Sequence, residues 1–286
     1  MLRPPHPTHI VVLVRLWSNA LLPYAKFVYP RFPSRISHYE EFGGIDIVRR
    51  LLQIPGIDVN AELNDSTNPI LNAVNGGNLE LVELLANAGG NLSYKGGRLK
   101  SNLLMFAIDS GSIPIVQYLI QKGVNINEAD ESGWFPLTLA VVYSLNDIAK
   151  ILVDAGADLN IKFYGEPLII FAIYPYYYNT EMFKYFIDNG VDVDAQDSDG
   201  KTALYWAISY ENFEAFDFLV SAGADVNKQS SDGVSLLFLS IRDGNENMTT
   251  YLIDNGADVN LRTIRDFTPA YAAVVVNCDK TRPKIY

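Results

Sequence analysis

The chain has 286 residues, of which 49% are apolar, so it is long and apolar enough to bury a substantial core. Its net charge of −11 at pH 7 repels a phosphate backbone, which argues against nucleic acid as a partner. A single cysteine excludes an internal disulfide and favours a reducing, intracellular setting such as the cytoplasm, and no apolar run approaches the roughly 18 residues of a membrane-spanning helix.

Residues 1–35 differ in composition from the rest of the chain. Up to residue 60 there are seven basic and four acidic residues, a net of +3, so residues 61–286 carry −14. Six of the 14 prolines precede residue 34. We expect this Pro-rich segment to be a basic arm or an extra helix that packs on the body. A cleaved secretory signal is disfavoured because Arg15 interrupts the apolar stretch.

From residue 56 onward a short string recurs at nearly constant spacing. A degenerate copy, GGNLS, begins at Gly89. Six close copies (GIDVN, GVNIN, GADLN, GVDVD, GADVN and GADVN) begin at Gly56, Gly123, Gly156, Gly190, Gly223 and Gly256. Successive glycines are 33 or 34 residues apart. A fixed period of this length predicts a repeat protein with one supersecondary unit per period.

Each period also holds the same order of predicted elements. A short apolar segment such as TALYWA (202–207), whose Ala207 lies 16 residues before Gly223, predicts a short inner helix. A longer segment with apolar residues three and four apart, such as LELVELLANAG (79–89), predicts an outer helix. The glycine that follows suits a left-handed helix cap, and an extended hairpin loop leads into the next period.

With this pattern the chain resembles the ankyrin repeat family. DSDGKTALYWA from Asp197, DESGWFPLTLA from Asp130 and the GADVN strings match the family pattern, roughly D-x-x-G-x-T-P-L-H-x-A-A and then L-L-x-x-G-A-D-V-N. The resemblance implies an all-α ankyrin-repeat solenoid of stacked helix–turn–helix units with short β-hairpin loops over residues 36–286. It places six full repeats at 61–93, 94–127, 128–160, 161–194, 195–227 and 228–260, with partial repeats at 36–60 and 261–278.

The histidine that the family carries after Thr-Pro-Leu is absent from every copy. Its position is occupied by Leu71, Met105, Thr138, Ile170, Tyr205, Phe238 and Tyr271. We therefore expect apolar stacking between inner helices to replace the hydrogen bonds of the family's Thr–His pair.

The segment AIYPYYYNTEMF (172–183) departs from the period. Gly190 follows Ala172 by 18 residues instead of 16, so two residues are inserted within residues 174–179. Pro175 is expected to end the inner helix, which enlarges the turn between the two helices. In arrays of the family that this chain resembles, this turn faces the partner. The tyrosines are therefore candidates for partner contact; the alternative is that they fill the seam between helices.

Neighbouring repeats carry a tyrosine at the aligned turn, and successive repeats are expected about 10 Å apart. The rings of Tyr174 and residues 176–178 should then form a continuous stripe with those of the neighbouring repeats. Tyrosine is enriched at binding hot spots. Trp206 is predicted to be core, because its aligned positions are all apolar, whereas Trp134 is predicted to be exposed at a hairpin. The aromatic candidates for partner binding are Trp134, Tyr143, Tyr174, Tyr176, Tyr177 and Tyr210.

Charged residues at the hairpin tips and inner-helix ends form a second group of candidates. Most are acidic, which suggests a partner segment that carries Lys or Arg beside apolar side chains, although a charged solvated face is the plainer interpretation. The charged candidates are Arg98, Asp109, Glu131, Asp199, Lys201 and Asp243.

The residues needed for catalysis are scarce. From residue 39 onward there is no histidine and only one cysteine, which excludes Ser-His and Cys-His nucleophiles and His/Cys zinc clusters from the body. Neither G-x-x-x-x-G-K-[ST] nor G-x-G-x-x-G is present. Carboxylate pairs such as Asp197 with Asp199 lie in predicted hairpins, where Asp is favoured by turn chemistry. We expect no catalytic site, no metal and no cofactor.

The resemblance implies a non-catalytic adaptor or scaffold that binds another protein on its concave face, through hairpin tips and the tyrosine stripe. A monomer is expected in the unbound state. Two alternatives stay open: a membrane-peripheral protein held by residues 1–35, and an enzyme with an unrecognised site. Removal of residues 1–35 and assay of membrane fractionation would separate the first alternative from the adaptor.

Overall fold

The computed structural model describes residues 44–62 and 66–281, and it falls into two compact units, Met1–Ala140 (unit 1) and Val141–Tyr286 (unit 2). The segment predicted as an arm, residues 1–35, lies outside the described residues. In the described part, no helix has the length and apolarity needed to cross a bilayer.

Unit 1 consists of helix pairs joined by a tight turn, and a hairpin leads from one pair to the next. Helix α4 packs on α5 and α6, and α6 packs on α7. The β1–β2 hairpin is antiparallel, with Lys95 opposite Asn102. The elements are α3 (Gly44–Leu51), α4 (Pro69–Asn75), α5 (Leu79–Asn87), β1 (Lys95–Gly96), β2 (Ser101–Asn102), α6 (Leu103–Asp109) and α7 (Ile113–Gln121). Helix α8 (Pro136–Val142) runs across the division between the units.

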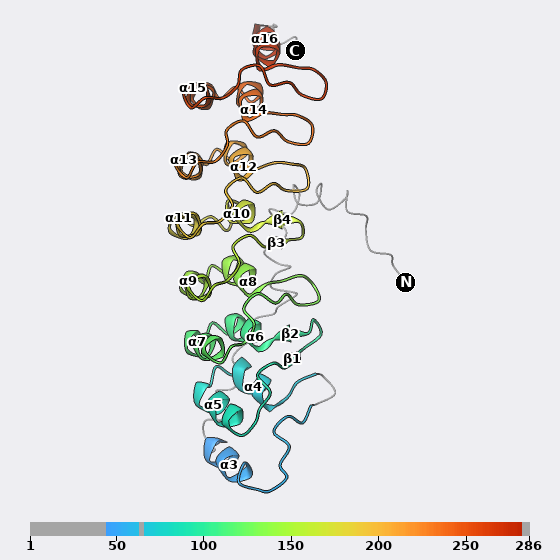
Figure 1. Ribbon diagram of the computed structural model, residues 1–286, viewed down its shortest axis with the longest axis vertical. Coiled ribbons are helices and arrows are strands. Elements are labelled where there is room, and N and C mark those ends of the chain that lie inside the picture. The colour runs from blue at the N-terminus through green and yellow to red at the C-terminus, as the bar shows by residue number, and fades with distance from the viewer. Residues whose placement is uncertain (1–43, 63–65, 282–286) are drawn as a thin grey trace, which may run out of the picture. The chain divides into compact units, whose positions relative to one another are not determined.

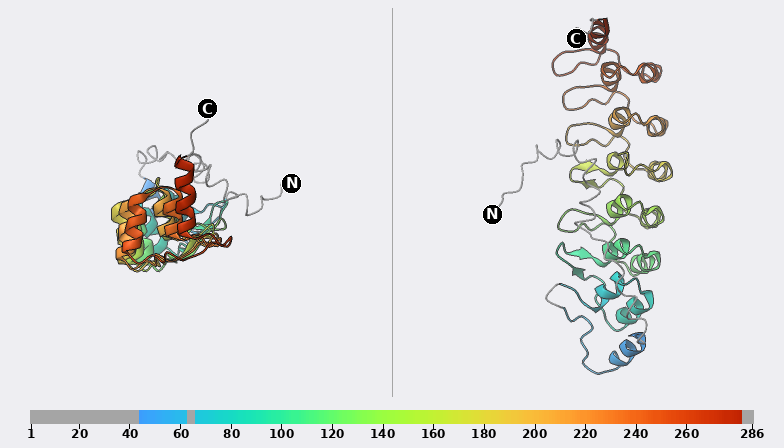
Figure 2. Two further views of the ribbon diagram at one scale, coloured as in Figure 1. Left: turned by 90° about the horizontal axis from the view of Figure 1, so that it is seen from above. Right: turned by 180° about the vertical axis from the view of Figure 1, so that it is seen from behind.

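Unit 2 repeats this arrangement. The inner helices α10, α12, α14 and α16 form one column, the outer helices α9, α11, α13 and α15 form a second, and the hairpin loops project on the opposite side of the inner column (Figures 1 and 2). The elements are α9 (Asn146–Asp154), β3 (Lys162–Phe163), β4 (Glu166–Pro167), α10 (Leu168–Phe171), α11 (Thr180–Asp188), α12 (Ala203–Ser209), α13 (Phe213–Ser221), α14 (Leu236–Arg242), α15 (Glu246–Asp254) and α16 (Pro269–Thr281).

The helices begin and end as their sequences predict. The inner helices α6 and α14 open on a side-chain cap: the Asn102 Oδ1 accepts from the Met105 N–H at 3.1 Å, and the Ser235 Oγ accepts from the Phe238 N–H at 3.2 Å. The glycine of each recurring string follows the outer helix in the left-handed region, with φ between +77° and +93° from Gly56 to Gly256. The predicted glycine caps are confirmed.

Apolar side chains of both helices in a pair fill the core. Ile70, Leu104 and Leu119 are completely buried in unit 1, as are Phe186 and Leu219 in unit 2. Most side chains at the position of the missing histidine are buried: Leu71, Met105, Thr138, Ile170 and Tyr205. Apolar side chains therefore pack at this position in Leu71, Met105 and Ile170, whereas the Thr138 Oγ1 accepts from the Phe135 N–H at 3.0 Å.

The asparagine that ends a recurring string ties one repeat to the next. In unit 2 the Asn227 Nδ2 donates to the Gly256 carbonyl at 3.1 Å, and the Asn227 Oδ1 accepts from the Asp258 N–H at 2.7 Å. In unit 1 Asn60 does the same with the carbonyl of Gly89 and the N–H of Asn91. The amide thus satisfies backbone groups that the loop would otherwise leave without a partner.

The insertion predicted in residues 174–179 is present as an enlarged turn. Helix α10 has four residues, whereas the aligned α12 has seven, and it ends at Phe171, before Pro175. The Tyr174 carbonyl accepts from the N–H groups of Tyr177 and Tyr178, at 2.8 and 2.9 Å. The Asn179 side chain then caps α11 by accepting from the Met182 N–H at 2.9 Å.

Candidate functional site

Four rings meet where the enlarged turn adjoins α12, and we call Phe171, Tyr174, Trp206 and Tyr210 the ring cluster. Tyr174 stands edge-on to three neighbours, with centroid distances of 5.8 Å to Phe171, 6.1 Å to Trp206 and 5.8 Å to Tyr210. Trp206 stacks on Tyr210 at 5.6 Å. Such geometries stabilise ring pairs beyond their buried area, so the cluster is a fixed surface on two consecutive repeats.

The prediction that Trp206 is core is wrong. Its side chain is half-buried, although the flanking Tyr205 and Ala207 are buried. The cause is its polar edge: the Trp206 Nε1–H donates to the Asp197 Oδ2 at 2.9 Å, which holds the indole at the base of the hairpin.

The tyrosines of the enlarged turn point in different directions. Tyr176 is 51% exposed, and Tyr177 is half-buried and stacks on Phe171 at 4.7 Å. Tyr178 turns to the outer helices instead, where it packs on Phe183 at 5.5 Å and its hydroxyl donates to the Glu214 Oε2 at 3.2 Å. The continuous stripe predicted through residues 176–178 is therefore interrupted at Tyr178. In the preceding turn of unit 2, Tyr143 is half-buried.

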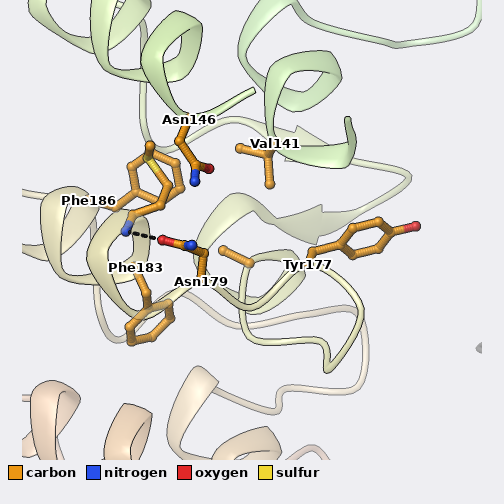
Figure 3. A pocket seen from close by; sticks show the side chains of 8 residues that line it. Val141, Asn146, Tyr177, Asn179, Phe183 and Phe186 are labelled. Carbon is orange, nitrogen blue, oxygen red and sulfur yellow. Dashed lines mark hydrogen bonds between the residues drawn. The ribbon is translucent and has the colours of Figure 1, made fainter. Parts of the chain in front are cut away.

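A small pocket lies behind the enlarged turn. Figure 3 shows Tyr177 with its ring directed away from Phe183 and Phe186, while Val141, Asn146 and Asn179 line the hollow. Its volume of about 10 Å³ is room for about one water molecule. This pocket therefore cannot hold a small-molecule ligand.

Asp197 organises the hairpin beside the ring cluster. It is 8% exposed, and its Oδ1 accepts from the N–H groups of Asp199 and Lys201, at 2.9 and 2.8 Å. With the Trp206 bond on Oδ2, the carboxylate has three donors. Asp197 is consequently a structural residue of the turn.

The hairpin also places a cation on the rings. The Lys201 Nζ lies 3.0 Å from the Asp199 Oδ2, 5.3 Å from the Tyr205 ring centroid and 5.1 Å from that of Trp206. The lysine side chain is 15% exposed. Lys201, Asp199, Tyr174 and Tyr210, all predicted from the sequence, are thus brought together, with Trp206 at their centre.

Glu166 of β4 completes this site and was missed by sequence reasoning. Burial, and then the charges of Asp197 and Asp199, raise its pKa to about 7, partly offset by Lys201 and by a hydrogen bond from the Tyr174 hydroxyl. Burial and the same carboxylate raise the pKa of Tyr174. One sign was available: with Ile170 aligned to Thr138 and Tyr205, Glu166 takes the place of Trp134 and Lys201, so an acidic residue stands where the neighbouring hairpins carry a ring or a cation.

Replacement of Glu166 by glutamine should stabilise the protein at high pH. A carboxyl whose pKa rises from 4.5 to about 7 on folding binds a proton more tightly in the folded state, so stability falls as the pH rises through this window. Solvent screening at a half-buried group reduces the effect, and we expect a gain of about 1–2 kcal/mol at pH 8. Thermal melts from pH 4 to 8 measure it.

The gain should shrink between pH 7 and pH 4.5 and vanish near pH 4, where both states hold the proton. Glu211→Gln, at an exposed turn position of the same unit, is the control and should show no such trend. A gain of equal size at every pH would show that ionisation of Glu166 is not its source.

Four of the predicted candidates, Arg98, Asp109, Glu131 and Trp134, belong to unit 1. The prediction of an exposed Trp134 is wrong, because its side chain is 9% exposed. The Asp130 N–H donates to the Trp134 carbonyl at 2.9 Å and the Trp134 N–H to the Asp130 Oδ1 at 3.0 Å, so residue 134 closes a compact turn and its ring packs inward. Arg98 and Glu131 are exposed at hairpins, and Asp109 is half-buried at the end of α6.

Asp243, the last charged candidate, follows α14 in unit 2. Its carboxylate pairs with the Arg242 Nε at 2.8 Å, with both side chains exposed. Within residues 44–62 and 66–281, no group of three or more His, Cys, Asp or Glu side chains is arranged to hold a metal ion.

Comparison with known proteins identifies the fold. A family model described as ankyrin repeats in three copies matches residues 38–130, 91–163 and 164–230, and a model of the single ankyrin repeat matches residues 232–264. The ankyrin repeat protein FPV031 of fowlpox virus is 32% identical over 121 residues, which cover 41% of this chain and 35% of that protein. The chain therefore spans about a third of that relative's length.

Solved structures show the same architecture. The ankyrin repeat domain of Bcl-3 matches with a TM-score of 0.65 and 24% identity, over 75% of this chain and 100% of that one. A chain from the complex of the Bd0816 predatory endopeptidase of Bdellovibrio bacteriovorus with the immunity protein Bd3460 matches with a TM-score of 0.55 and 24% identity, over 66% and 98%. With family models matched over most of its length, the chain belongs to the ankyrin repeat family.

Proposed function

We propose that this protein is a non-catalytic interaction module that binds another protein through the surface of unit 2 around the ring cluster and the enlarged turn. The observation that carries the proposal is the half-exposed side chain of Tyr176, in the same enlarged turn as Tyr174, whose ring is fixed by its neighbours in the ring cluster. A tyrosine offers a large contact area and a hydroxyl at low entropic cost, and a preformed surface loses little freedom on binding.

The repeat architecture supports this proposal. Ankyrin-type stacks present a long rigid surface, and the Bd0816–Bd3460 structure is a protein complex in which a chain of this fold takes part. Fold alone does not give function, so the argument depends on the site. Asp199 in the hairpin and Asp243 after α14 remain candidates for contacts at the edge of this interface, and Arg98 and Glu131 remain separate candidates on unit 1.

Replacement of Tyr176 by alanine tests the proposal. A partner captured by the full chain is purified, and its direct affinity is measured by calorimetry for the wild type and the variant. We expect an affinity loss of at least tenfold, since buried tyrosines at interfaces often contribute more than 1 kcal/mol. The melting temperature should stay unchanged, because the side chain is half-exposed in the unbound protein.

Tyr271→Ala is the matched control. Tyr271, on α16, is also 51% exposed but lies three repeats further along the chain. Its loss should change the affinity less than twofold. Equal effects of the two variants, or no effect of either, would place the interface elsewhere.

A further inference from the structure

The charges around the ring cluster do not balance. Three carboxylates (Glu166, Asp197 and Asp199) act on one another there, and Lys201 is the ammonium group among them. Asp197 is engaged by its three donors, and Asp199 is paired with Lys201. The Lys201 ammonium is paired with Asp199 and offsets the charge of Glu166 only in part, so Glu166 is the carboxylate that is least compensated.

One carboxylate oxygen of Glu166 also lacks a hydrogen-bond donor among the described residues. This oxygen, Oε2, is buried. A buried acceptor without a partner is costly, so such a group calls for an explanation. The residue as a whole is half-buried, so a cation at the adjoining surface would act on its charge.

The site already holds one cation of the chain itself, the Lys201 ammonium. The Lys201 ammonium is held between a carboxylate and the face of an indole, a typical environment for an organic cation in a protein. Tyr174 and Tyr210 extend the aromatic surface next to Trp206, and the Tyr174 hydroxyl reaches Glu166. A second cation would find the same two elements there, a ring surface and a carboxylate.

We propose that this site receives a basic side chain, Lys or Arg, of the protein partner, with Glu166 as its countercharge. This inference rests on the proposed function and specifies the chemistry of the partner. The other groups that face the site are Asp197, Asp199 and Lys201 from the hairpin, the Tyr174 and Tyr210 hydroxyls, and the Arg242–Asp243 pair, which reaches the cluster through Tyr205.

Binding of a cation should be linked to ionisation of Glu166. The neutral carboxyl offers no charge to a basic group, and the arriving cation in turn lowers the carboxyl's pKa. From residue 39 onward the chain has no histidine, so no other side chain of the body ordinarily titrates between pH 6 and 8. With a pKa of about 7, the ionised fraction falls about tenfold from pH 8 to pH 6, and affinity should fall with it.

The test uses a histidine-free random octapeptide library displayed on phage and selected on the full chain at pH 7.5. Enriched peptides should contain Lys or Arg, and replacement of that residue by Gln should weaken binding at least fivefold. Glu166→Gln should cause a similar loss and remove the pH dependence, whereas Glu246→Gln, an exposed residue of α15, should not. The melting temperature of each variant shows that it is folded.

The outcomes separate the two proposals. Enriched peptides that depend on Tyr176 but carry no essential basic residue, or that bind the Glu166→Gln variant as well as the wild type, overturn the inference and leave the proposed function standing. Peptides that depend on neither Tyr176 nor Glu166, or a library from which nothing is enriched, count against both.

Discussion

Replacement of Asp197 by alanine is expected to lower the free energy of unfolding by about 3 kcal/mol. The change leaves the N–H groups of Asp199 and Lys201 and the Trp206 Nε1–H without their acceptor at a position that is 8% exposed. A charged acceptor forms stronger hydrogen bonds than a neutral one, and loss of the Asp197 carboxylate leaves all three donors without it. Denaturant unfolding followed by circular dichroism measures the difference.

Two further variants make this prediction specific. Asp199→Ala removes a half-exposed carboxylate and its ion pair with Lys201, and we expect a cost below 1 kcal/mol. Asp197→Ser should lie between the two, because the aligned Ser230 accepts from the Val234 N–H at 3.2 Å in the next hairpin. If Asp197→Ala costs no more than Asp199→Ala, the hairpin does not depend on this acceptor.

Loss of Asp197 should also change the pKa of Glu166. Because its charge contributes to the raised pKa of Glu166, the pKa of that carboxyl should move down in the Asp197→Ala variant. Carbon-detected NMR titration of Glu166 in the wild type and the variant would show the direction of the change.

The period and the helix caps could be read from the sequence because they depend on local chemistry. Glycine at the end of each outer helix takes a backbone conformation that other residues rarely adopt, so Gly123 or Gly223 marks a helix end wherever it recurs. The enlarged turn could be found in the same way. An 18-residue interval and Pro175 leave few places where the inner helix can end.

The two tryptophans show where alignment of repeats fails. An aligned position gives the average environment of a residue, not the direction of one large side chain. Trp206 leaves the core because its Nε1–H requires an acceptor, which Asp197 provides nine residues earlier. Trp134 is drawn inward because residue 134 closes a tight turn with Asp130. Both outcomes depend on contacts that the repeat pattern does not specify.

Glu166 could not be assigned a role from the sequence at all. Its raised pKa depends on burial and on carboxylates 31 and 33 residues further along the chain, at Asp197 and Asp199. The sequence shows that neighbouring hairpins are acidic, but not which side chains approach one another. Long-range electrostatics of this kind becomes visible only when the distances between repeats are known.

Replacement of Gly200 by alanine should cost about 3 kcal/mol, because two effects combine. The residue has φ +74°, where an L side chain is strained by about 1 kcal/mol. An added Cβ would also lie 2.8 Å from the backbone nitrogen of Ser231 and 3.3 Å from the carbonyl carbon of Ser230. The two hairpins would have to separate there, which stretches the hydrogen bond from the Ser231 N–H to the Asp199 carbonyl, now 2.7 Å.

Gly133→Ala isolates the first effect. Gly133 has φ +83°, but nothing lies within 4 Å of the added Cβ, so this variant should lose only about 1 kcal/mol. Hydrogen exchange of the Ser231 amide reports the second effect directly. Its protection should fall strongly in Gly200→Ala and remain as in the wild type in Gly133→Ala. Equal destabilisation by both variants, with the Ser231 amide unchanged, would mean that the hairpins of unit 2 tolerate separation and that their contact contributes little to the stack.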